Sequence, residues 1–138
     1  MIYLVDTGPL VSAFARRETA FKRWAEALLV TLPLPLVTCE PVVTEAAHML
    51  GSGDRLLEAM HRGLLVCRFD LQANADSVRQ LCARYASLPM DLADACLVQL
   101  YETYRAGTAT IVTVDREDFS VYRAHRNQPL LCEFPPTG

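Results

Sequence analysis

The sequence predicts an α/β protein with a three-layer α/β/α architecture and a central, mainly parallel sheet of about four or five strands. Short runs of β-branched and other apolar residues recur along the chain, and each run is too short for a helix. Longer segments with apolar residues at helical spacing separate these runs. Strands that alternate with helices favour parallel pairing, because each crossover returns the chain to the same edge of the sheet.

The composition favours a single domain over residues 1–138. A length of 138 residues is close to the commonest domain size, and a hydrophobic fraction of 51% supplies material for a core. No apolar run approaches the roughly 18 residues of a membrane helix. No basic residue precedes the amino-terminal apolar stretch, so we expect no secretory signal and a cytoplasmic protein.

The predicted elements follow in order from the apolar pattern. Residues 2–5 form a strand that ends at Asp6, and Thr7, Gly8 and Pro9 make a turn after it. Further strands are expected at residues 36–39, 64–67, 110–114 and 130–132. Helices are expected at residues 9–15, between Thr19 and Pro33, and at 42–50, 54–62, 71–85 (with Asp70 as its cap) and 91–101. Residues 116–119 suit a turn or short helix, and residues 135–138 suit a frayed tail.

Cysteine, histidine and charge narrow the class of protein. The five cysteines stand at wide spacings with no C-x-x-C pair, which suits buried free thiols better than disulfides or a zinc site. The three histidines show no ligand spacing, and a net charge of -3 provides no global basic field for nucleic acid. The most basic segment carries Arg16, Arg17, Lys22 and Arg23. It fits either a solvated helix face or a phosphate-contacting patch.

Acidic residues from four parts of the chain are predicted to meet at one edge of the sheet. Asp6 and Asp115 each directly follow a strand, and Asp91 and Asp94 are neighbours in the first turn of a helix. Glu45 lies on or beside the apolar stripe of its helix. Each acid also has a purely structural explanation, because aspartates suit helix N-termini and Glu45 can be exposed at the edge of the stripe.

The shared edge gives these acids a common chemistry. In a parallel sheet with right-handed crossovers, the carboxyl ends of the strands and the amino ends of the following helices lie together. Crowded carboxylates repel one another, and they persist only with bound cations or raised pKa values. Because the donors are oxygens, the hard ions Mg²⁺ and Mn²⁺ fit better than zinc.

Four segments, in this order, resemble the motifs of PIN-domain ribonucleases, and in particular the VapC-type toxins of prokaryotic toxin–antitoxin pairs. The segments are Val5-Asp-Thr7, the helix with Glu45, Met90-Asp-Leu-Ala-Asp-Ala95 and Thr113-Val-Asp-Arg-Glu-Asp-Phe119. The likeness spans essentially the whole chain. It carries the family's acidic quartet onto Asp6, Glu45, Asp94 and Asp115, with Asp91 as an alternative or auxiliary to Asp94. Thr7 and Thr113 match polar positions that flank the acids, and Asp118 falls outside the quartet.

The resemblance implies a metal-dependent endoribonuclease with Mg²⁺ or Mn²⁺ as its cofactor. Asp6 and Asp94 would be the main metal ligands, and Glu45 and Asp115 would hold a second ion or orient the attacking water. Arginines beside the acids would steer the RNA substrate, and the candidates are Arg16, Arg17, Arg23 and Arg116. The family further implies a homodimer and an antitoxin whose extended segment blocks the site.

Two other classes of protein share parts of this pattern. A phosphoryl-transfer domain of the receiver or dehalogenase type needs a late lysine or a second aspartate two residues after the first. Here the only lysine is the early Lys22, and the second position is Gly8. A catalytically silent binding protein, whose acids are all helix caps, would bind no divalent ion, so titration with Mn²⁺ separates it from a nuclease.

Overall fold

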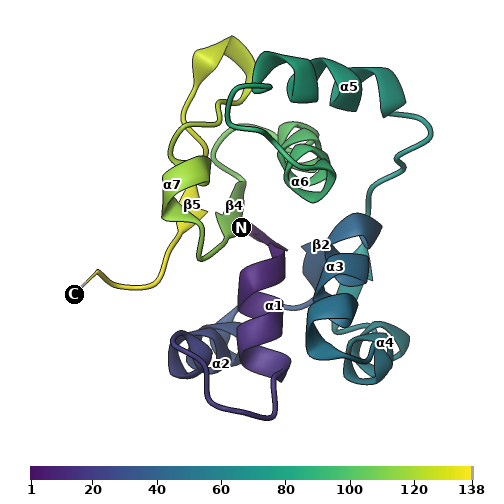
Figure 1. The fold of residues 1–138 in the computed structure, drawn as a ribbon, viewed down its shortest axis with the longest axis vertical. Coiled ribbons are helices and arrows are strands. Elements are labelled where there is room, and N and C mark those ends of the chain that lie inside the picture. Colours follow the sequence, from purple (N-terminus) through teal and green to yellow (C-terminus); the bar gives the residue numbers. More distant parts are fainter. Residues whose placement is uncertain (138) are drawn as a thin grey trace.

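The computed structural model describes residues 1–137 and has the predicted three-layer α/β/α architecture (Figure 1). Its sheet has five strands in the order β3-β2-β1-β4-β5, and every neighbouring pair is parallel. The strands are β1 (Ile2–Val5), β2 (Leu36–Thr38), β3 (Leu65–Cys67), β4 (Ala109–Val112) and β5 (Cys132–Glu133). The predicted tail ends at Gly138, which lies outside the described residues.

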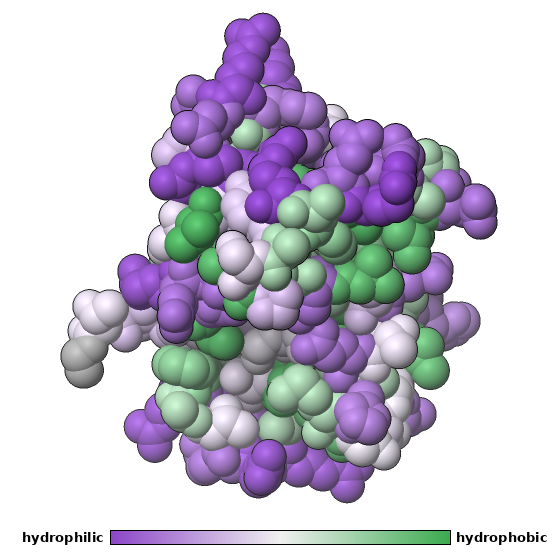
Figure 2. All heavy atoms as spheres, turned by 45° about the horizontal axis from the view of Figure 1, so that its top comes forward, coloured by the Kyte–Doolittle hydropathy of each residue, from purple (hydrophilic) through white to green (hydrophobic). Residues whose placement is uncertain are grey.

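Helices cover both faces of this sheet. They are α1 (Thr7–Phe14), α2 (Lys22–Thr31), α3 (Glu40–Leu50), α4 (Asp54–His61), α5 (Ala75–Arg84), α6 (Leu92–Glu102) and α7 (Arg116–Phe119), with a 3-10 turn at His125–Asn127. Figure 1 shows α1 to α4 gathered in one half of the molecule and α5 to α7 in the other. In Figure 2 hydrophilic side chains predominate toward the top of the view. No helix within residues 1–137 is long and apolar enough to cross a membrane.

The centre of the sheet is the centre of the core. Leu4, Val37 and Ile111, from three adjacent strands, are completely buried. Short apolar runs without alternation are expected where helices cover both faces of a parallel sheet. Truncating such a side chain to alanine typically costs about 2–5 kcal/mol of stability. The positions of the strand ends, and therefore of the acids that follow them, rest on this buried core.

The helix predicted over residues 71–85 begins later than expected. It starts at Ala75, and residues 71–74 form a turn. The Asp70 carboxylate accepts a hydrogen bond from the Ala73 N–H at 3.1 Å, and the Asn74 side-chain amide donates to the Asp70 carbonyl at 2.7 Å. Asp70 therefore caps this turn and not α5, because short polar side chains compete with helix formation by bonding to nearby backbone.

Candidate functional site

The register of the two central strands brings Asp6 beside Thr113. Val5 of β1 pairs with Val112 of β4, so the residues that leave these strands are neighbours. The Thr113 hydroxyl donates to Asp6 Oδ2 at 2.7 Å and accepts from the Asp115 N–H at 3.1 Å. Asp6 stands at the N-cap position of α1 without a capping side-chain bond. Helix capping therefore does not account for this buried carboxylate.

Asp91 and Asp94, which open α6, have different surroundings. Asp91 is exposed, and its carboxylate accepts from the Asp94 N–H at 2.8 Å, so capping explains its position. Asp94 is only 8% exposed, and its carboxylate accepts from the hydroxyl of the buried Tyr122 at 2.8 Å. Tyr122 is a residue that the sequence did not single out. Nothing in its local pattern marks it, because its partner lies 28 residues away.

The carboxylates of Asp94, Asp115 and Asp118 converge. One oxygen from each lies within 4.8 Å of the other two, although Asp118 stands outside the predicted quartet. The Asp115 carboxylate also accepts from the Asp118 N–H at 2.9 Å and so caps the short α7. The one-turn helix explains how Asp118 joins the group, because it folds the residue three positions later back onto Asp115.

Burial and mutual repulsion raise the pKa values of the two most enclosed acids. Burial raises the pKa of Asp6 to about 6, against the lowering effect of the Thr113 hydroxyl, and the charge of Glu45 adds to the rise. The pKa of Asp94 is raised to about 8, mainly by burial and further by the negative charges of Asp6 and Asp91. The surroundings of Asp6 and Asp94 thus disfavour ionisation of their side chains unless a cation is bound.

Glu45 lies at the rim of the site, on α3. Glu45 is exposed, which is one of the two positions that its place on the helix allows. Partial desolvation of its carboxylate is the main cause that raises its pKa, and the charge of Asp91 adds to the rise. Glu45 and Asp91 border a groove of about 770 Å³ between the amino ends of α3 and α6. The nearby Thr7 hydroxyl is buried, with no hydrogen-bond partner among residues 1–137.

The donors suit a hard divalent cation. Asp94, Asp115 and Asp118 offer oxygens close enough to share one ion, and Asp6 adds a charge that acts on Asp94. Carboxylate oxygens are the ligands that Mg²⁺ and Mn²⁺ prefer. A cation would relieve the repulsion between the acids, so the residues fit the predicted metal.

The predicted arginines are not gathered around these acids. Arg116 is adjacent, but its guanidinium donates to the Pro135 carbonyl at 2.8 Å and lies 4.5 Å from the centre of the Phe134 ring. Arg16 and Arg17 follow α1, whose eight residues span about 12 Å. They therefore lie at the other end of that helix from Asp6. Arg23 is exposed on α2.

Fold and site together define an α/β protein with a partly buried acidic cluster at the carboxyl edge of its parallel sheet. No protein-family model matches the chain, and no curated protein matches it. Its function is therefore inferred from the chemistry of this cluster.

Proposed function

We propose that the protein is a metal-dependent endoribonuclease that hydrolyses RNA phosphodiester bonds. The proposal depends on one observation: acids from distant parts of the chain converge, with Asp94 and Asp115 close enough to share an ion and Asp6 acting on Asp94. The resemblance of these segments to PIN-domain ribonucleases supports the same assignment. Capping alone would leave the buried Asp6 and Asp94 unexplained.

Asp6, Asp94 and Asp115 would hold Mg²⁺ or Mn²⁺, with Asp118 as a further donor. When bound, such an ion stabilises the charge that develops on the phosphate and lowers the pKa of the attacking water. Glu45 stands at the open rim of the cluster, where an RNA phosphate can approach. Its raised pKa suits a group that orients or deprotonates water.

Hydroxyl groups hold the two buried acids in place. Thr113 donates to Oδ2 of Asp6, and Tyr122 donates to Oδ2 of Asp94. The other carboxylate oxygen of Asp94 accepts no hydrogen bond within residues 1–137 and keeps its lone pairs for a cation. Such outer partners fix the direction of a ligand, and their loss typically reduces metal affinity about 10–100-fold.

The biological setting in this proposal comes from the resemblance alone. It makes the chain a cytoplasmic toxin that acts as a homodimer and is blocked by an antitoxin protein. Co-expression with an adjacent small gene product and co-purification as a complex would support that setting. The nuclease activity is testable without it.

The test is incubation of the purified protein with total RNA and Mg²⁺ or Mn²⁺, followed by mapping of the cut ends. We expect cleavage that EDTA stops and excess Mn²⁺ restores. Asp6→Asn and Asp94→Asn should lower the rate by on the order of a hundredfold or more, since each removes a group that acts in the chemical step. The matched control is Asp76→Asn, an exposed acid on α5 that should cleave normally. Equal cleavage by the wild type and both site variants would remove these acids from the mechanism.

A further inference from the structure

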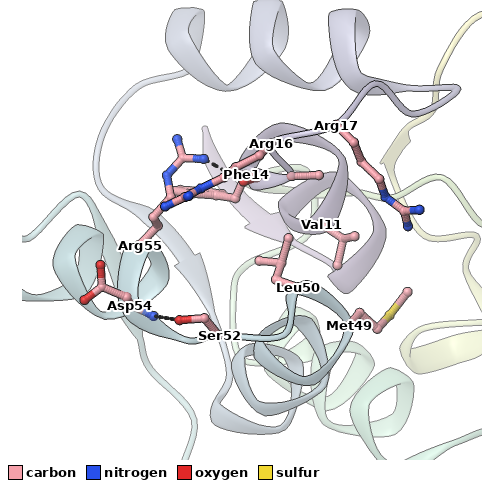
Figure 3. A pocket seen from close by; sticks show the side chains of 10 residues that line it. Val11, Phe14, Arg16, Arg17, Met49, Leu50, Ser52, Asp54 and Arg55 are labelled. Carbon is pink, nitrogen blue, oxygen red and sulfur yellow. Dashed lines mark hydrogen bonds between the residues drawn. The ribbon is translucent and has the colours of Figure 1, made fainter.

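A second feature, at the far end of α1 from the acids, is a cavity of about 510 Å³ with a positively charged rim (Figure 3). We call it the arginine pocket. Arg16, Arg17 and Arg55 surround an apolar floor that includes Val11, Phe14 and Met49. Figure 3 shows Arg55 on one side of the opening and Arg17 on the other. The arginines come from two separate parts of the chain, the loop after α1 and the first turn of α4.

The backbone that carries the arginines is anchored from both sides. Arg55 donates to the Phe14 carbonyl at 2.6 Å, and its guanidinium lies 5.2 Å from the centre of the Phe14 ring. Lys22 donates to the carbonyls of Ala13 and Ala15. These bonds satisfy carbonyl groups at the end of α1 that have no partner within the helix. The pocket is thus held open by contacts that do not use Arg16 or Arg17.

The charge of the pocket is not balanced by the protein. Arg16 and Arg17 are exposed, and within residues 1–137 their side chains make no ion pair or hydrogen bond. Asp54 is the single acid among the described residues that line the cavity, against three arginines. Arginines around one opening without carboxylate partners make it positively charged and attract anions, and a planar guanidinium fork matches phosphate oxygens in pairs.

A seam between α1 and α3 connects the pocket with the acidic cluster. The two helices pack together and run in the same direction: Thr7 approaches Glu45 at one end, and Phe14 and Met49 share the pocket at the other. Figure 1 shows α1 and α3 side by side. Glu45 precedes Met49 by four residues, or about 6 Å along the helix axis. The pocket therefore begins about one helical turn beyond Glu45, and Arg16 and Arg17 lie at the end of α1 away from Asp6.

We propose that the arginine pocket binds a backbone phosphate of the same RNA strand that is cut at the acidic cluster, away from the scissile bond. The inference rests on the proposed nuclease function and adds a second point of contact to it. Three arginines supply the charge for a phosphate, and the apolar floor offers contact for a ribose or base. Because α1 spans about 12 Å, an RNA strand that reaches both sites has to extend along the seam.

The test measures binding of fluorescent single-stranded RNA by fluorescence anisotropy, with Asp94→Asn as background so that RNA stays intact. The pocket variant carries Arg16→Ala and Arg17→Ala together in this background. The matched control is Arg62→Ala with Arg105→Ala, which removes the same charge from exposed positions outside the pocket. We expect the pocket variant to bind about tenfold or more weakly. The dependence of log K on log salt should become shallower by about 0.7, the contribution of one single-strand phosphate contact. The control substitutions should change neither the affinity for RNA nor its salt dependence. Thermal melting shows whether both variants are folded.

Three outcomes would overturn the inference: an unchanged affinity in the pocket variant, an equal loss in the control, or displacement of RNA by polyglutamate as effectively as by unlabelled RNA. The last result would mark the pocket as a site for an acidic peptide. Cleavage assays keep this test apart from that of the nuclease. EDTA-sensitive cleavage together with RNA binding that does not depend on Arg16 and Arg17 would contradict the proposal for the pocket and keep the nuclease function. RNA binding that depends on these arginines, without any cleavage, would contradict the nuclease function and keep RNA binding at the pocket.

Discussion

Replacing Asp94 by asparagine should stabilise the metal-free protein at pH 8, although Asp94 lies in the proposed site. The pKa of Asp94 is raised from 3.8 to about 8, so the folded protein binds more protons than the unfolded chain between these values. Stability therefore falls as the pH rises through this window. At about 1.4 kcal/mol for each pKa unit, the full cost at pH 8 approaches about 5 kcal/mol. Asparagine avoids this cost, and its amide oxygen can still accept from Tyr122.

The assay is thermal unfolding in EDTA at pH 5 and pH 8. We expect the two proteins to melt together at pH 5, where Asp94 is protonated. At pH 8 the variant should be about 2–5 kcal/mol more stable, the lower figure allowing for relaxation around the charge. This corresponds to a rise in Tm on the order of 10 °C. Asp76→Asn is the control, because Arg79, at 2.7 Å, lowers the pKa of that exposed acid. A variant that melts at or below the wild type at pH 8 would refute the reasoning.

Two further substitutions test the surroundings of the site. Tyr122→Phe removes the donor to Asp94 and should cost about 1–3 kcal/mol in urea unfolding, because a buried carboxyl oxygen loses its partner; an unchanged midpoint would mean that the bond contributes nothing. Gly8→Ala would place a Cβ in steric overlap with Val114 Cγ2, so we expect a loss of about 1–3 kcal/mol in thermal unfolding. Adding Val114→Ala should recover part of that loss, and strictly additive losses would contradict the proposed clash.

The strands and the approach of Asp115 to Asp94 could be predicted because both follow from local pattern and sheet geometry. The apolar run before Asp6 is a strand, and parallel pairing with β4 places Asp6 at the level of Thr113. The predicted strand over residues 110–114 ends at Val112, which leaves Thr113 free to turn its hydroxyl toward Asp6. The helical pattern allows Glu45 to be either buried or exposed, and the structure shows it exposed.

What could not be predicted depends on tertiary contacts or on the length of an element. Tyr122 reaches Asp94 through packing that no spacing in the sequence encodes. Arg16 and Arg17 are near Asp6 in sequence, but an intervening helix carries them to its opposite end. The convergence of Asp118 with Asp94 depends on the path of the chain after β4 and not on a motif.

The most direct test of the central claim, that the acidic cluster binds a hard divalent ion, is calorimetric titration of the metal-free protein with Mn²⁺. The account predicts binding to the wild type with an affinity that rises with pH, because the metal displaces protons from Asp94 and Asp6. Asp6→Asn and Asp94→Asn should lose this binding, and Asp76→Asn should keep it. Absence of binding to the wild type, or equal binding by all four proteins, would contradict the account.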